Sequence, residues 1–444
     1  MVTPSPAAPT DPTATGPGTT TSADGNGNGD NAGSAAVTTS ANGQATTNDT
    51  TTDATTDATT DTGSWRRAVL VGLSAFVVSR LCVLAGAGVR ASQVTVDANI
   101  DPERSPESPL SLITGVFTQW DGNWYLEIVR NGYPRSIPPD ITYFQLQARA
   151  AFFPLYPLAV RVLDVVAPGS DTVAALGLNL VLAIAAVLLV GVLARRLYDD
   201  VVAERAMVLF AVFPGSFVLS YAYAEALLIV LAAACFWLLL EERWLLAGVV
   251  AALATATRPN GVAVVAACAV AAFIAIRRNR DWGSLAAPLL APIGFVAFQL
   301  FLGRHTGEAG AWFRVQSEAW REGTSFGATA ISNTLSFLTH PLESPTDALT
   351  AASIAALALG LWCLWRKRLP WPMIAYIAVI VALMLIPATV TARPRFLFTA
   401  FPLMISAAAW WPRRDRAVWD LMLVACGAGL VALTALYGVF GAIP

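Results

Sequence analysis

Long apolar runs, separated by short polar turns, follow one another through most of the chain. Several of them reach the ~18–20 consecutive apolar residues that a helix needs to cross a membrane. They predict about eleven membrane spans, placed at residues 67–90, 172–194, 203–220, 222–240, 244–257, 260–276, 284–303, 347–365, 371–389, 395–411 and 417–441. The pattern therefore predicts an all-α polytopic integral membrane protein.

One apolar segment is too short and too rich in proline to join this series. Residues 151–166, AFFPLYPLAVRVLDVV, are interrupted by Pro154 and Pro157, and proline disrupts the hydrogen bonds of a helix interior. We expect an interfacial or re-entrant helix there. Counting the segment as a span would reverse the orientation of everything that follows, so the charges of the loops must decide.

The basic residues of the short loops set the orientation, because loops rich in arginine and lysine stay in the cytoplasm. With eleven spans, one side collects Arg66, Arg67, Arg195, Arg196, Arg243, Arg277, Arg278, Arg280, Arg366, Lys367, Arg368, Arg413, Arg414 and Arg416. The short turns of the opposite side hold only Arg258, Arg393 and Arg395. We therefore expect a multi-pass protein of the cell membrane with a cytoplasmic N-terminus. The long loops 91–171 and 304–346 then lie on the outer face.

Residues 1–64 differ from the rest of the chain in composition. They are rich in Thr, Ala, Gly, Asp and Pro, contain the repeat TTDATTDATT, and lack aromatic and basic residues. Such a segment buries too little apolar surface to offset the entropy of ordering. We expect a disordered tail at 1–64, followed by a transmembrane domain at 65–444.

Composition also narrows the partners. Only 13% of the residues are charged, against roughly 25% in soluble domains, so the lipid bilayer is the expected partner and nucleic acid is not. The chain has only two histidines, and its five cysteines lie in apolar runs without the spacing of metal ligands. We expect no metal-binding cluster, while a divalent ion that accompanies a substrate stays open.

Four polar motifs fall on the outer side of this layout. They are QWDGNW (119–124), SYAYAE (220–225), TRPNG (257–261) and TARPRF (391–396). Ionisable groups at membrane depth are costly, by roughly 2.5–3.5 kcal/mol for a central Arg or Asp on the insertion scale. Because four such motifs converge on one face, we expect them to form a shared site.

Asp121 stands between two tryptophans at the start of a predicted short helix. Trp120 and Trp124 share a stripe with Ile128 that would lie in the membrane interface. Tyr125 shares the neighbouring stripe with Asp121. Asp121 is expected either to cap the helix N-terminus or to act as a general base that takes a proton from a hydroxyl group. The two roles are compatible if one carboxylate oxygen stays free.

Arg258 in TRPNG, and Arg393 and Arg395 in TARPRF, place basic groups on the same face. Each motif alone is consistent with a turn at the interface and a snorkelling arginine. Together with Asp121 they favour a phosphate-binding site, because the guanidinium fork pairs with phosphate oxygens. Asn260 of the TRPNG turn is a further candidate for substrate binding.

Tyr223 and Glu225 lie at the outer end of a predicted helix. Glu225 could bind sugar hydroxyls, orient Arg258, hold a metal ion, or simply be solvated. Aromatic and acidic residues in loop 304–346 are typical of carbohydrate binding but form no specific motif. Arg80, within the first span, is expected to snorkel or to pair with another helix.

A single acid is enough for a displacement whose leaving group is a stable anion. Glycoside hydrolases need a second carboxyl group to protonate a poor leaving group. A transferase that uses a sugar phosphate instead needs cations that stabilise charge on the departing phosphate. Asp121 and the arginines therefore fit a sugar-phosphate transferase.

The motifs match a known family in order. QWDGNWYLEIVRNGYP, AFFPLYPLAVRVL, FPGSFVLSYAYAEALL and ATATRPNGV resemble the phosphatidylinositol-glycan class V mannosyltransferases, that is, glycosylphosphatidylinositol mannosyltransferase II and its bacterial relatives in the GT-C superfamily. The resemblance runs from about residue 66 to 411.

The resemblance implies a GT-C-like inverting glycosyltransferase. Its catalytic acid would lie in the first outer loop, at Asp121, and its donor would be polyprenyl-phosphate mannose, acting as a co-substrate with no other cofactor. The acceptor would be an envelope glycolipid, polysaccharide or glycoprotein. The alternative is a transporter or flippase that binds a lipid-linked sugar without reacting, although no internal repeat supports it. An inactive scaffold subunit is a third possibility.

Overall fold

The computed structural model describes residues 53–100, 108–166, 168–388, 393–412 and 416–441, and every regular element within them is a helix. The α-helices are α1 (Asp53–Ile100), α2 (Pro109–Thr118), α3 (Asp121–Asn131), α4 (Leu155–Val166), α5 (Asp171–Leu197), α6 (Asp200–Val212), α7 (Glu225–Leu240), α8 (Trp244–Thr255), α9 (Val262–Asn279), α10 (Ala286–Leu290), α11 (Ile293–Thr306), α12 (Ala311–Glu318), α13 (Ala328–Thr339), α14 (Pro345–Arg366), α15 (Trp371–Leu385), α16 (Pro394–Thr399), α17 (Pro402–Trp410) and α18 (Arg416–Gly438). Short 3₁₀ helices η1 (Leu146–Ala151), η2 (Pro214–Ser220), η3 (Pro259–Gly261) and η4 (Trp282–Leu285) lie between them.

The helices confirm the predicted all-α polytopic class. Six are long and apolar enough to cross a membrane, or seven if the bent pair α6 and η2 counts as one span. The predicted number was about eleven, and each remaining predicted span coincides with a shorter or broken helix, namely α7, α8, α15 and the pair α16 and α17. The apolar runs were therefore located well, but their lengths as continuous helices were overestimated.

Small side chains line the seams between the helices. Helix α5 packs against α6 and α7, α7 against α8, and α9 against α15. The buried core there is rich in alanine, for example Ala183, Ala186, Ala203, Ala232 and Ala267, none of which is solvent-exposed. In a membrane, association depends on close van der Waals packing, and alanine lets helix backbones approach.

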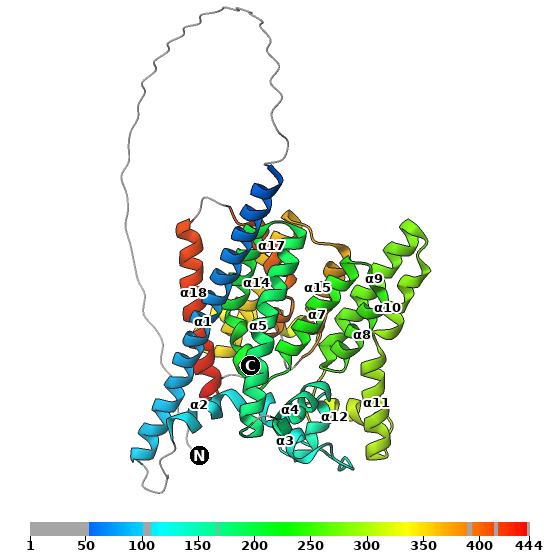
Figure 1. Ribbon diagram of the computed structural model, residues 1–444. Coiled ribbons are helices and arrows are strands. Elements are labelled where there is room, and N and C mark those ends of the chain that lie inside the picture. The colour runs from blue at the N-terminus through cyan, green and yellow to red at the C-terminus, as the bar shows by residue number, and fades with distance from the viewer. Residues whose placement is uncertain (1–52, 101–107, 167, 389–392, 413–415, 442–444) are drawn as a thin grey trace, which may run out of the picture. The chain divides into compact units, whose positions relative to one another are not determined.

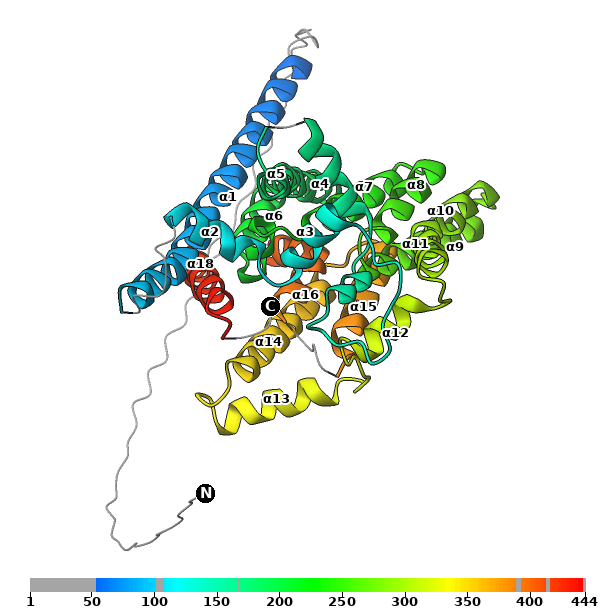
Figure 2. The same cartoon turned by 90° about the horizontal axis from the view of Figure 1, so that it is seen from below.

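The short helices α2, α3, α4 and α12 gather at one end of the long helices (Figure 1). Figure 2 looks onto this end, where α3 and α16 meet through side chains. Helix α4 has only 12 residues, too few to cross a bilayer, which matches the interfacial or re-entrant helix expected at 151–166. This end carries all the polar motifs that the sequence singled out.

The predicted tail at 1–64 needs a partial correction. Helix α1 begins at Asp53, inside the segment expected to be disordered, because a helix that is already nucleated extends at low cost through residues of ordinary propensity. Residues 1–52 lie outside the described part of the chain.

Candidate functional site

Asp121 occupies the first turn of α3 and does not cap it. The N-cap position belongs to Trp120, which makes no side-chain cap hydrogen bond and has φ 58° and ψ −122°. A positive φ is strained for a bulky residue and is retained where neighbouring contacts enforce it. Trp120 is held by its indole N–H, which donates to the Tyr437 carbonyl at 3.1 Å, and by ring contact with Phe440. The capping interpretation was wrong, and the carboxylate is free for other contacts.

The carboxylate of Asp121 meets two guanidiniums. Arg395 Nη1 donates to Asp121 Oδ2 at 2.8 Å, and Arg258 Nη2 lies 3.7 Å from the same oxygen. No described residue hydrogen-bonds to Oδ1, and 15% of the side chain is exposed. Asp121 thus has one oxygen anchored by cations and one oxygen left to accept a proton.

Glu225 completes the arrangement from the start of α7. Its Oε1 lies 2.6 Å from Arg258 Nη1 and 3.5 Å from Arg395 Nε, and only 1% of its side chain is exposed. These contacts are ion pairs without hydrogen-bond geometry, so both Glu225 oxygens retain the capacity to accept hydrogen bonds. Asp121, Glu225, Arg258 and Arg395, here called the charge cluster, carry two negative and two positive charges.

All four predicted motifs therefore meet, each through one of these four side chains. Glu225 is not a solvated helix end and Arg258 is not a snorkelling arginine, because the two side chains are buried against each other. Buried ion pairs survive only when their charges are matched. The sequence signal was the presence of ionisable groups beside apolar spans.

Tyr223 lies against the charge cluster. The guanidinium carbon of Arg395 sits 5.4 Å from the centroid of the Tyr223 ring, in cation–π geometry. The Tyr223 hydroxyl is buried and has no hydrogen-bond partner within the described part of the chain. Asn179 of α5 donates to the carbonyls of Tyr221 and Tyr223, the latter at 2.9 Å. Sequence reasoning missed Asn179, although a polar residue in the middle of an apolar span was a signal.

A bend positions the segment that leads to Glu225. Helices α6 and η2 meet at 74°, at Pro214, which cannot continue the hydrogen bonds of a helix. Arg80 of α1 fills the bend: its guanidinium donates to the Ser216 carbonyl at 2.9 Å, the Ser216 hydroxyl at 2.9 Å and the Ser220 hydroxyl at 2.8 Å. Arg80 therefore pairs helices, one of its two expected roles, and supports the approach to the charge cluster.

The TRPNG turn brings Arg258 into place. A Cβ on Gly261 would lie 2.3 Å from the Ala254 carbonyl oxygen, so only glycine permits this tight turn. The Ala256 carbonyl accepts the backbone N–H of Leu155 at 3.1 Å, which joins the AFFPLYP motif to the turn. Asn260 lies in η3, partly exposed, and among the described residues no hydrogen bond links its side chain to the charge cluster.

Arg393 is buried, with 3% of its surface exposed, but it does not join the charge cluster. The one hydrogen bond that its side chain makes to a described residue, from Nη1 to the Thr346 carbonyl, is long at 3.4 Å. The two arginines of TARPRF, which the sequence treated alike, thus have different surroundings.

Trp124 and Ile128 of α3 are not placed as predicted. Trp124 and Ile128 are 9% and 5% exposed and face protein, not the membrane interface. The Trp124 ring contacts Tyr143 and Trp320 edge to face, with centroids 5.6 and 6.1 Å apart. The prediction failed because the covering residues come from distant segments of the chain. Sequence spacing alone could not reveal them.

Tyr125 packs beneath the charge cluster. Its ring meets Tyr156 and Phe152 edge to face at 5.0 and 5.1 Å. Burial raises the pKa of the Tyr125 hydroxyl well above its ordinary value. Tyr125 therefore stays a neutral phenol at physiological pH and is not a base.

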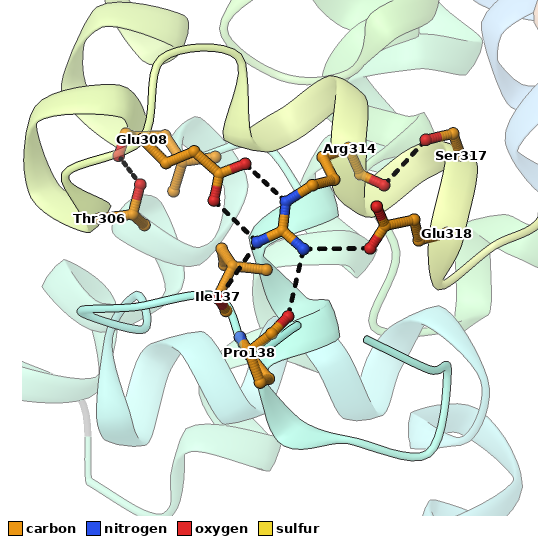
Figure 3. Close-up of polar contacts among 8 residues, drawn as sticks. Ile137, Pro138, Thr306, Glu308, Arg314, Ser317 and Glu318 are labelled. Carbon is orange, nitrogen blue, oxygen red and sulfur yellow. Dashed lines mark hydrogen bonds and ion pairs between the residues drawn. The ribbon is translucent and has the colours of Figure 1, made fainter. Parts of the chain in front are cut away.

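Arg314 of α12 connects the segment around residues 308–318 with residues 137–138 (Figure 3). It donates to Glu308 at 2.5 and 2.7 Å, to Glu318 at 3.0 Å, and to the carbonyls of Ile137 and Pro138 at 3.1 Å each. These contacts hold the pKa of Glu308 below its ordinary value. The loops 91–171 and 304–346, which are far apart in sequence, are thereby joined.

Within the described ranges no group of three or more His, Cys, Asp and Glu side chains is placed to hold a metal ion. The positive charge around Asp121 comes from arginine. Its chemistry suits an anionic substrate group and a hydroxyl that loses a proton.

Comparisons with known proteins agree with the motifs. Residues 107–281 match the family described as Mannosyltransferase (PIG-V). No curated protein matches the sequence of the chain.

The solved structures that are similar include the oligosaccharyltransferase of Archaeoglobus fulgidus in the apo form, with 15% identity, 83% of this chain and 55% of that chain covered, and a TM-score of 0.40. They also include the archaeal oligosaccharyltransferase AglB from Archaeoglobus fulgidus in complex with an inhibitory peptide and a dolichol-phosphate, with 12% identity, 71% and 51% coverage, and a TM-score of 0.35. The chain spans about half the length of these proteins, and the likeness is distant.

The family match covers Asp121, Tyr223, Glu225 and Arg258, whereas Arg393 and Arg395 lie beyond it. The resemblance stated from the motifs is confirmed over this region, where residues 107–281 are similar to the mannosyltransferase (PIG-V) family.

Proposed function

We propose that this protein is an inverting glycosyltransferase that moves mannose from a polyprenyl-phosphate donor to a hydroxyl group of an envelope glycolipid, polysaccharide or glycoprotein. Asp121 is the general base. The family match at residues 107–281 supports mannose as the sugar. The observation that carries the mechanism is the Asp121 carboxylate, with Oδ2 held by Arg395 and Arg258 and Oδ1 without a hydrogen-bond partner among the described residues.

The reaction is a single displacement. The acceptor oxygen attacks the anomeric carbon of the sugar from the face opposite the phosphate. The bond between that carbon and the phosphate oxygen breaks, and its electron pair leaves with the polyprenyl phosphate. The proton of the acceptor hydroxyl passes to Oδ1 of Asp121. One displacement inverts the configuration at the anomeric carbon, and no second acid is needed because phosphate is a stable leaving group.

The other members of the charge cluster set the geometry. Arg258 and Arg395 come from different turns and hold the carboxylate in one orientation, which lowers the entropic cost of reaching a reactive arrangement. Glu225 balances both guanidiniums, and its free hydrogen-bonding capacity suits a sugar hydroxyl. The unpartnered Tyr223 hydroxyl suits the same purpose.

The site is proposed to face the outside of the cell membrane. The arginine-rich short loops support a cytoplasmic location for the opposite ends of the helices. Donor and acceptor would both reach the site along the membrane surface, where a polyprenyl phosphate presents its headgroup.

Transfer from a defined donor tests the proposal. Right-side-out vesicles that contain the protein should move labelled mannose from polyprenyl-phosphate mannose to an acceptor on the outer surface. Linkage analysis should show an anomeric configuration opposite to that of the donor. Vesicles in which the donor binds but is never consumed would instead indicate a carrier of lipid-linked sugars.

A further inference from the structure

Among the described residues, Arg258, Arg393 and Arg395 are buried and Arg80 is partly buried. Arg258 and Arg395 are paired with the carboxylates of the charge cluster. Arg80 has no carboxylate partner among the described residues, but it donates three hydrogen bonds of 2.8–2.9 Å to the bend between α6 and η2. The charges of Arg258 and Arg395 are therefore compensated, and the guanidinium of Arg80 is satisfied by hydrogen bonds.

Arg393 is the exception within the part of the chain that the structure describes. It is 3% exposed, makes one hydrogen bond of 3.4 Å, and forms no ion pair with a described carboxylate. Its Nε is buried and without a partner. The nearby carboxylate of Asp347 interacts with Arg393 electrostatically but does not pair with it. The Asp347 carboxylate instead accepts a hydrogen bond from Ser336 at 2.8 Å. Burying an uncompensated guanidinium is costly unless an anion joins it.

A second unpartnered donor lies near Arg393. The Tyr437 hydroxyl of α18 is buried, has no hydrogen-bond partner among the described residues, and lies within electrostatic reach of Arg393. The carbonyl of Tyr437 accepts hydrogen bonds from Gln119 at 2.9 Å and from Trp120 at 3.1 Å. These two residues immediately precede Asp121, so the Arg393 region adjoins the candidate base.

We propose that Arg393, with the Tyr437 hydroxyl as a second donor, is the subsite for the phosphate group of a lipid-linked donor, and that Arg258 and Arg395 serve the two carboxylates. This rests on the proposed function and divides the arginines, which the sequence could not separate, into two roles. A guanidinium offers several donors in a planar fork that matches phosphate oxygens. A bound phosphate would supply the negative charge that Arg393 does not receive from a described carboxylate.

Because Arg393 and Arg395 are assigned different roles, their substitutions should affect the thermal stability of the protein differently. Arg393→Gln removes a charge that forms no ion pair with a described carboxylate, so the ligand-free variant should unfold at a temperature equal to or above that of the wild type. Arg395→Gln leaves Asp121 and Glu225 without one of their cations and should unfold at a lower temperature. A drop for Arg393→Gln as large as that for Arg395→Gln would overturn the proposal.

Binding tests the ligand directly. In detergent micelles, the purified protein is titrated with polyprenyl phosphate, uncharged polyprenol, inorganic phosphate and phosphatidylglycerol. The wild type should bind polyprenyl phosphate at least tenfold more tightly than polyprenol. Arg393→Gln should abolish this difference, Arg393→Lys should restore part of it, and Tyr437→Phe should weaken phosphate binding several-fold. Arg304→Gln, an exposed site on α11, is the matched control and should bind as the wild type.

The outcomes separate the two proposals. Undiminished preference for polyprenyl phosphate in Arg393→Gln overturns the subsite, even if the wild type transfers sugar. Equal binding of phosphatidylglycerol, or of inorganic phosphate alone, also overturns it, since the site would then serve a membrane lipid or a free anion. If instead the Arg393 dependence holds but the wild type transfers no sugar, the subsite stands and the transferase proposal fails.

Discussion

At the scale of single residues, the two carboxylates of the charge cluster differ in their exposure to solvent. Asp121 is 15% exposed, while Glu225 is 1% exposed and touches both arginines. Both carboxylates contact both arginines, and the more accessible one, Asp121, remains able to meet a substrate. The two side chains are both carboxylates in different environments. We expect the buried Glu225 to have a structural role and the more accessible Asp121 to react.

Glu225→Gln should therefore destabilise the protein by about 3–5 kcal/mol, because it leaves two buried guanidiniums with only Asp121. Chemical denaturation in detergent measures the change. Glu308→Gln makes the same substitution in the partly exposed pair with Arg314 and should cost no more than about 1 kcal/mol. Equal losses for the two variants would mean that the cluster is not held together as described.

At the scale of elements, close contact between η2 and α16 carries Arg395 to Asp121. A Cβ on Gly215 would lie 2.3 Å from the Pro394 carbonyl oxygen, so the two elements touch through backbone. Helix α16 has only six residues and cannot resist displacement by its own stability. The position of Arg395 thus depends on a glycine in a different motif.

Gly215→Ala should move α16 away from η2 and lengthen the contact between Arg395 and Asp121. We expect at least a tenfold loss of transfer, since small misplacements near a reacting group have large effects on rate. Gly177→Ala is the control, because a Cβ at that position in α5 meets nothing within 4 Å. The rate of sugar transfer and the thermal stability are measured for both variants. A fully active Gly215→Ala would show that the position of Arg395 does not depend on Gly215.

At the scale of the whole molecule, the apolar pattern predicted the class and the location of the long apolar helices, but not the short helices α2, α12 and α13 of the two long loops. Two predicted spans, 203–220 and 395–411, ran through prolines at which the helices break: η2 and α17 begin at Pro214 and Pro402. Asp121, Glu225, Arg258 and Arg395 were recognisable since charge beside a membrane span is rare.

Their partners were harder to recognise from sequence. Asn179 donates to the backbone carbonyl of Tyr223, and the backbone carbonyl of Tyr437 accepts hydrogen bonds from Gln119 and Trp120. Trp124 has the residue type of an interfacial aromatic but faces a cover formed by other loops. Which face of a short helix is buried depends on tertiary packing, and its own periodicity does not identify the covering element.

The central claim is that Asp121 accepts the proton of the acceptor hydroxyl. The most direct measurement compares Asp121→Asn with the wild type in transfer from polyprenyl-phosphate mannose and in binding of polyprenyl phosphate. The account predicts that the amide variant binds the lipid phosphate within a few-fold of the wild type but transfers sugar at least 10²-fold more slowly, the lower end of typical general-base contributions. Transfer at the wild-type rate by Asp121→Asn would contradict the account.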